Sequence, residues 1–171
     1  ILLVTFGASS PEARKVYLNI DRMAKARFPD CRIRWAYTSD IIRKKLAAQG
    51  ESVDSVGDAL DKFKEEKTDL VFVQSLHVIP AMEYNQVLDE VEKHKNHFRA
   101  IKAGTPLLNS MKDLRSAAEI ILAKLPPERR KEDAVLFMGH GSPRHHADLI
   151  YVAAAHVFSK LDGNAFIASV E

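Results

Sequence analysis

The sequence contains almost no cysteine. Cys31 is the single cysteine among 171 residues, so this chain cannot form an internal disulfide. A zinc or iron–sulfur site built from several thiolates is excluded for the same reason. We place Cys31 on the core-facing side of a strand and assign it no chemistry.

Long apolar runs and a strong net charge are also lacking. No run approaches the roughly 20 apolar residues that a membrane-spanning helix needs, so we expect no membrane span. Basic side chains number 25 and acidic ones 23, which leaves a formal net charge of +2. Such a weak field does not favour nucleic acid or an anionic membrane surface as a partner.

The two ends of the chain look trimmed. Residues 1–4 already form an apolar run without an initiator methionine, and residues 165–170 resemble a strand with nothing after Glu171. We therefore expect residues 1–171 to be a first domain, and the chain to continue beyond residue 171. We also expect a cytoplasmic location, although the trimmed amino terminus leaves an exported form open. The sequence does not indicate the oligomeric state, so a homo-oligomer is also an open possibility.

Short apolar runs alternate with amphipathic helical stretches along the whole chain. This alternation is typical of βαβ units and predicts an α/β fold, with a parallel sheet flanked by helices on both faces and one domain over residues 1–171. The segments 1–6, 70–75 and 134–138 are almost continuously apolar, as strands buried on both faces are. The segments 31–37 and 98–103 alternate instead, which predicts strands nearer the sheet edge.

Helices are expected between these strands, where apolar residues recur with the helical period. One begins with Ser10 as its N-cap and Pro11 at its first position, and carries an apolar stripe that includes Val16 and Met23. The others are expected near 53–63, from 109 or 110 to 125, and over 144–161.

Ligands of open parallel sheets bind beyond the carboxyl ends of the strands. This rule selects the loops 7–10, 38–40, 76–80, 104–106 and 139–143, and it places Glu171 at the same edge. We expect these segments to converge in space.

His140 stands between two glycines at the end of an expected strand, where little side-chain cover surrounds it. Imidazole titrates near neutrality and binds divalent metals when it is neutral, so His140 suits a metal ligand or a general base. The alternative, a turn histidine with a solvated ring, is equally compatible with the spacing.

Three further residues are candidates at the same edge. Glu171 can share a metal with His140 or take up protons, or it is a solvated carboxylate. Glu83 falls in the first turn of a helix, where the helix dipole alone also explains it. For His77 the residues alone favour a loop-packing role with hydrogen bonds to the backbone.

Several segments together resemble the anaerobic sirohydrochlorin cobaltochelatases, the long two-domain class II chelatases of the CbiK type. They are LVTFGAS (3–9) with PEAR (11–14), RWAYTS (34–39) with IRKKL (42–46), VQSLH (73–77) with EY (83–84), and MGHGS (138–142). The resemblance covers residues 1–171. The short chelatases carry a His-Gly-Ser turn after their first strand, whereas this chain has Phe6-Gly7-Ala8, which favours the long form.

The resemblance implies two similar α/β domains around a tetrapyrrole, with insertion of Co²⁺ into sirohydrochlorin in exchange for two protons and without ATP. His140 corresponds to the family histidine that binds the metal and accepts a proton, Glu171 to a glutamate ligand, and Glu83 to another active-site carboxylate. Co²⁺ is then a substrate, and no organic cofactor is inferred. The family's second metal-binding histidine has no counterpart here. We assign substrate contacts to Phe6, Gly7, Ser9, Leu76, His77, Gly139, Gly141 and Ser142.

Other functions fit the same residues. Iron or nickel insertion is one, because Co²⁺, Ni²⁺ and Fe²⁺ accept the same ligands. A non-catalytic module that binds a tetrapyrrole or a metal is another, and it predicts binding without turnover. An α/β domain in which His140 only packs predicts neither.

Overall fold

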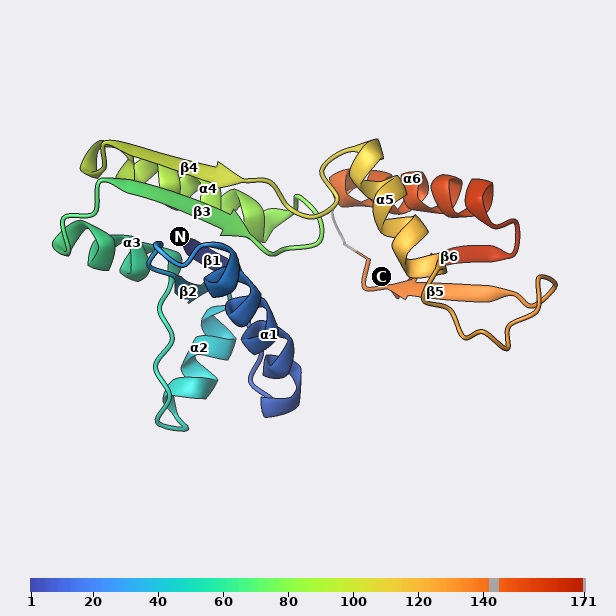
Figure 1. Ribbon diagram of the computed structural model, residues 1–171, viewed down its shortest axis with the longest axis horizontal. Coiled ribbons are helices and arrows are strands. Elements are labelled where there is room, and N and C mark those ends of the chain that lie inside the picture. Colours follow the sequence, from blue (N-terminus) through green and yellow to red (C-terminus); the bar gives the residue numbers. More distant parts are fainter. Residues whose placement is uncertain (142–144, 171) are drawn as a thin grey trace. The chain divides into compact units, whose positions relative to one another are not determined.

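The fold is taken from a computed structural model that describes residues 1–141 and 145–170, without the side chains of 145–148. The chain forms two compact units (Figure 1). Unit 1 comprises Ile1–His77 and Met82–Pro106, and unit 2 comprises Val78–Ala81 and Leu107–Glu171. A single domain over 1–171, followed by a second one, stays a prediction.

Unit 1 is a four-stranded parallel sheet with the strand order β2-β1-β3-β4. Its elements are β1 (Leu2–Thr5), α1 (Pro11–Arg27), β2 (Arg34–Tyr37), α2 (Asp40–Ala47), α3 (Val56–Glu65), β3 (Leu70–Ser75), α4 (Met82–His94), a short 3₁₀ turn (Lys95–His97) and β4 (Ala100–Gly104). The two strands with alternating sequences, β2 and β4, lie at the edges of this sheet, which confirms their predicted position.

The core of unit 1 lies between the sheet and the helices α3 and α4. Leu2 and Val4 of β1 and Val73 of β3 are fully buried there, together with Leu60 and Phe63 of α3. Helix α1 packs against the opposite face, where the rings of Tyr17 and Trp35 lie 5.6 Å apart. Unit 1 therefore has helices on both faces of a parallel sheet, and the predicted α/β fold class is confirmed.

Unit 2 pairs two parallel strands, β5 (Val135–Gly139) and β6 (Ala165–Ser169), with the helices α5 (Met111–Leu122) and α6 (His145–Leu161). Its core joins α5, α6 and the sheet, and the rings of Phe137 and Phe158 lie 4.9 Å apart within it. The segment 78–81 belongs to this unit, because the Leu108 N–H donates to the Val78 carbonyl at 2.8 Å.

The helix starts follow the predicted caps. The Ser10 hydroxyl accepts a hydrogen bond from the Ala13 N–H and Pro11 opens α1, while Ser110 caps α5. Three expectations about packing were wrong. The strands β3 and β5 are not buried on both faces, because Phe72 and Leu136 on them are 45% and 59% exposed. Cys31 is exposed, because β2 begins only at Arg34. Residues Val16 and Met23 of the predicted α1 stripe are also exposed.

Among the described residues, no helix is both long and apolar enough to cross a membrane.

Candidate functional site

The carboxyl ends of three strands of unit 1 are tied together by backbone hydrogen bonds. The Thr38 and Ser39 N–H groups donate to the carbonyls of Thr5 and Phe6, at 2.9 and 3.2 Å. On the other side of β1, the Leu76 N–H donates to the Val4 carbonyl at 2.7 Å. The predicted loops after β1, β2 and β3 therefore converge at one edge of this sheet, as expected.

His77 lies across this edge between two hydroxyl groups. Its Nδ1 is 2.9 Å from the Ser75 Oγ and its Nε2 is 3.3 Å from the Thr38 Oγ1. The Ser75 side chain is buried and also accepts the His77 backbone N–H at 3.3 Å. Both ring nitrogens thus have protein partners, which favours the packing interpretation, with hydroxyls in place of the expected backbone groups. A substrate contact by His77 stays a prediction.

The charge state of His77 follows from its surroundings. Burial lowers the pKa of its imidazole below the ordinary value of 6.5, and the carboxylate of Glu83 opposes this effect. Glu83 lies in the first turn of α4, as predicted, and is half-buried. Unit 1 therefore places a neutral imidazole and a carboxylate at the same sheet edge, and a catalytic role of Glu83 stays a prediction.

The turn after β1 is closed by an aromatic ring. Gly7 has a φ of +105°, and a Cβ at this position would lie 2.5 Å from the Cδ2 of Tyr37. Phe6 before it is 48% exposed, whereas Leu76 and Ser9 are half-buried. Phe6 is therefore the predicted substrate contact of unit 1 whose apolar side chain is exposed at this edge of the sheet.

In unit 2, the Gly139-His140-Gly141 segment ends β5 as the sequence predicts. His140 is exposed, and Gly141 is buried with a φ of +86°. The carbonyl of Gly139 accepts a hydrogen bond from the Val170 N–H at 3.1 Å, which continues the β5–β6 pairing. The turn therefore presents an imidazole at the carboxyl end of a strand, where it is accessible to a metal or a proton.

Sequence analysis did not single out Tyr151 of α6, which contacts both glycines of this turn. Its hydroxyl accepts a hydrogen bond from the Gly141 N–H at 3.0 Å. A Cβ on Gly139 would lie only 2.2 Å from the Tyr151 Cε1. No sequence motif signals this contact, since Tyr151 lies 12 positions after Gly139 and only packing brings the two together.

Two predicted site residues, Ser142 and Glu171, lie outside the described residues. A shared metal site of His140 and Glu171 is therefore still a prediction. Within the part of the chain that the structure describes, no group of three or more His, Cys, Asp or Glu side chains is arranged to hold a metal ion.

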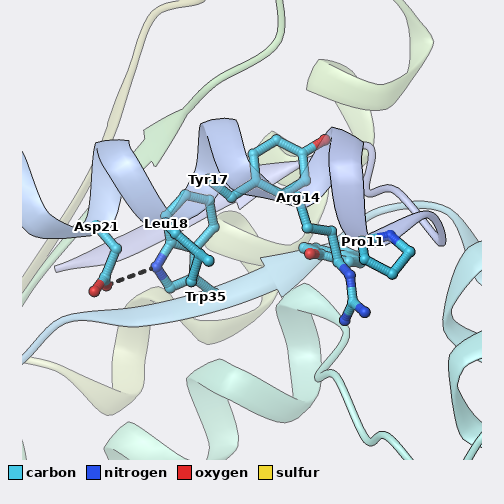
Figure 2. A pocket seen from close by; sticks show the side chains of 7 residues that line it. Pro11, Arg14, Tyr17, Leu18, Asp21 and Trp35 are labelled. Atoms are coloured by element: carbon cyan, nitrogen blue, oxygen red, sulfur yellow. Dashed lines mark hydrogen bonds between the residues drawn. The ribbon is translucent and has the colours of Figure 1, made fainter.

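A pocket of about 540 Å³ opens between α1 and β2 in unit 1 (Figure 2). Its lining includes Tyr17, Leu18 and Trp35, and the Trp35 Nε1 donates a hydrogen bond to the Asp21 carboxylate at 3.0 Å. The Arg14 guanidinium at its rim forms a bidentate ion pair with Glu51. The sequence suggested no site at this place, because residues of a helix and of a separate strand line the pocket and only packing brings them together.

Comparison with known proteins agrees with the resemblance. The family described as cobalt chelatase (CbiK) matches residues 1–171. The sirohydrochlorin cobaltochelatase CbiKC of Nitratidesulfovibrio vulgaris is 39% identical over 172 residues, covering 99% of this chain and 61% of that protein. The sirohydrochlorin cobaltochelatase of Salmonella typhimurium is 32% identical over 173 residues, covering 100% of this chain and 65% of that protein.

A solved structure shares the fold. SirB from Bacillus subtilis, determined with Fe³⁺, matches with a TM-score of 0.69 at 11% identity, over 99% of this chain and 64% of that one. At this identity the likeness concerns the fold alone. The chain spans 61 to 65% of the length of these two curated relatives. Since the match extends from the first residue to the last, the chain belongs to the cobalt chelatase (CbiK) family.

Proposed function

We propose that the full-length protein carrying residues 1–171 inserts Co²⁺ into sirohydrochlorin, without ATP, in anaerobic cobalamin biosynthesis. The observation that carries this proposal is the family match over the whole chain. Both curated relatives described above are named sirohydrochlorin cobaltochelatase, which supports the substrate and the metal.

The reaction exchanges one dication for two protons. Two pyrrole N–H bonds break, both protons leave the macrocycle, and the metal binds the nitrogens that are freed. A base must accept these protons, and the metal ligands must hold Co²⁺ weakly enough to release it into the ring. A neutral imidazole meets both needs near neutral pH, whereas a closed thiolate site binds a metal too tightly.

We assign the central role to His140, which accepts a proton and binds the incoming metal. Its exposed side chain, at a strand end between two glycines, supports this assignment. Glu171 is proposed as a second metal ligand and Glu83 as a further carboxylate that accepts protons. Apolar contacts with the macrocycle are proposed for Phe6 and Met82, which are 48% and 45% exposed.

The substitution His140→Ala tests this proposal in the full-length protein. We expect cobalt insertion to fall by at least about 100-fold, because general acid–base catalysis and a metal ligand are lost together. His156→Ala removes another exposed imidazole of unit 2 and serves as the matched control. Insertion is followed by the absorption change of sirohydrochlorin, and circular dichroism checks the fold. Full activity of His140→Ala would overturn the proposal.

Glu83 is tested by Glu83→Gln, which keeps the shape of the side chain and removes its charge. We expect insertion to fall by about 10-fold, toward the low end of general-base effects. Glu92→Gln is the matched control, because Glu92 is an exposed residue of the same helix whose carboxylate pairs with Lys95 at the surface. Equal rates of both variants would remove Glu83 from the mechanism.

Metal preference and cellular context belong to the same proposal. Parallel insertion assays with Co²⁺, Fe²⁺ and Ni²⁺ should give the highest kcat/KM with Co²⁺. Tight tetrapyrrole binding without any insertion would point to a carrier instead.

We propose a cytoplasmic location, which cell fractionation tests.

A further inference from the structure

One tyrosine contacts the turn of His140 on both of its sides. The ring of Tyr151 occupies the space where a Cβ of Gly139 would lie, 2.2 Å from the Tyr151 Cε1. Its hydroxyl accepts the hydrogen bond of the Gly141 N–H at 3.0 Å. The residues immediately before and after His140 are thus held by the same side chain of α6.

This turn requires such support because it is built from glycines. Glycine explores more backbone conformations than any other residue, so a Gly-His-Gly segment does not fix the direction of its histidine. Gly141 is buried and adopts a φ of +86°, and a buried backbone N–H without a partner costs free energy. The Tyr151 hydroxyl satisfies that N–H and restricts the turn at the same time.

We propose that Tyr151 is a positioning residue for His140: its ring and its hydroxyl hold the glycine turn in the conformation that presents the imidazole. This inference rests on the proposed function, because it concerns the step assigned to His140. Supporting partners of a metal-binding side chain typically change metal affinity or activity by about 10- to 100-fold when they are removed. Tyr151 acts through the backbone on either side of the ligand.

The substitution Tyr151→Phe in the full-length protein separates the two contacts. Phenylalanine keeps the ring over Gly139 and removes the acceptor of the Gly141 N–H. We expect kcat/KM for Co²⁺ to fall by about 10-fold while His140 is still present. Amide hydrogen exchange of ¹⁵N-labelled glycine is the second measurement, and we expect the Gly141 amide to exchange at least about 10-fold faster than in the unmodified protein.

Phe158→Leu is the control for stability. Phe158 lies on the same helix and packs on Phe137, with ring centroids 4.9 Å apart, in the core of unit 2. This variant should lower Tm while kcat/KM for Co²⁺ and the Gly141 exchange rate stay within about twofold of the unmodified protein. If it reduces insertion as much as Tyr151→Phe does, Tyr151 is merely structural and the inference is overturned.

A double-mutant cycle with Gly139→Ala tests the ring contact. The added Cβ collides with the Tyr151 ring, so Gly139→Ala alone should impair insertion by about 10-fold or more. In a Tyr151→Ala background the collision is gone, and Gly139→Ala should then add less than about twofold. Additive effects would overturn the ring part of the inference, because residues in contact are expected to be coupled.

The outcomes distinguish this inference from the function on which it rests. If His140→Ala abolishes insertion and Tyr151→Phe inserts Co²⁺ at the unmodified rate, the positioning role is overturned and the proposed function stands. If His140→Ala keeps full activity, the proposed function fails, and the positioning role fails with it.

Discussion

Two histidines follow strands of parallel sheets in this chain, and their surroundings differ. His77 follows β3 of unit 1, and its two ring nitrogens lie 2.9 and 3.3 Å from the hydroxyl oxygens of Ser75 and Thr38. His140 follows β5 of unit 2, is exposed, and has glycines as its chain neighbours. Both histidines therefore follow a strand, but the side chain of His140 is exposed whereas that of His77 is half-buried.

The comparison indicates that the residues around a histidine at a strand end determine whether its ring nitrogens are occupied by the protein or accessible to a ligand. Burial lowers the pKa of His77, and two hydroxyl partners occupy its ring nitrogens, which suits a residue that holds a loop in place. His140 is exposed, and the glycines on either side of it contact Tyr151, for which we propose the positioning role.

The largest expected effect is on activity. His140→Gln should lower cobalt insertion by at least about 100-fold with little change in Tm, because the side chain that we propose as base and metal ligand is lost from an exposed position. His77→Gln should lower Tm and reduce insertion by less than about 10-fold. Insertion kinetics and thermal denaturation of both variants provide the measurement. The contrast is wrong if the two variants lose activity equally.

The second effect concerns the closed turn of unit 1. Gly7→Ala combines a left-handed φ of +105° with a Cβ 2.5 Å from the Tyr37 ring, so we expect a loss of about 2–5 kcal/mol in the free energy of unfolding. Gly50→Ala is the matched control: its φ is +82° and no atom lies within 4 Å of the added Cβ. It should cost only about 1–2 kcal/mol in urea denaturation. Equal losses would show that the Tyr37 ring does not close the turn.

A smaller effect is expected from the hydroxyl partners of His77. Ser75→Ala leaves the Nδ1 of the half-buried ring without its 2.9 Å partner and should cost about 1–3 kcal/mol. Thr38→Val removes the longer 3.3 Å contact and should cost about 0.5–1.5 kcal/mol. Urea denaturation measures both losses. If Thr38→Val lowers the free energy of unfolding more than Ser75→Ala does, the Thr38 hydroxyl and not the Ser75 hydroxyl is the stronger partner of His77.

The smallest effect is the pH dependence that His77 contributes, because Glu83 opposes the influence of burial. The folded-state pKa lies below 6.5, so the unfolded chain takes up a proton at a higher pH than the folded chain. The free energy of unfolding should therefore fall as the pH falls through 6.5, and this contribution should level off below the folded-state pKa. Denaturation from pH 5 to 8 should show a flatter profile for His77→Gln, and an NMR titration should place the His77 pKa below 6.5.

Much of the fold could be predicted from local sequence patterns. Continuous apolar runs identified the strands β1, β3 and β5, and alternation identified the edge strands β2 and β4. Capping serines located the starts of α1 and α5. Helix α2 (Asp40–Ala47) was missed, because its eight residues are too few to show a clear helical period. The predicted position of Cys31 on the core-facing side of a strand was wrong, because alternation in the sequence does not show at which residue strand pairing begins.

The candidate site was only partly predictable. The Gly-His-Gly segment and the convergence of three loops follow from residue types and a general rule of parallel sheets. The partners of His77 and the contacts of Tyr151 depend on side chains that packing brings together. The division into two units was not foreseen either, because apolar runs do not indicate which strands pair.

The short segment Val78–Ala81 has a consequence for dissecting the molecule. The chain leaves unit 1 after His77, returns at Met82 and leaves again after Pro106, so three covalent crossings connect the units. A cut between Pro106 and Leu107 would leave a fragment 1–106 that carries unit 1 together with the segment Val78–Ala81 of unit 2. The hydrogen bond from the Leu108 N–H to the Val78 carbonyl, at 2.8 Å, would then join two separate chains. A single cut at that bond therefore cannot separate unit 1 from every residue of unit 2.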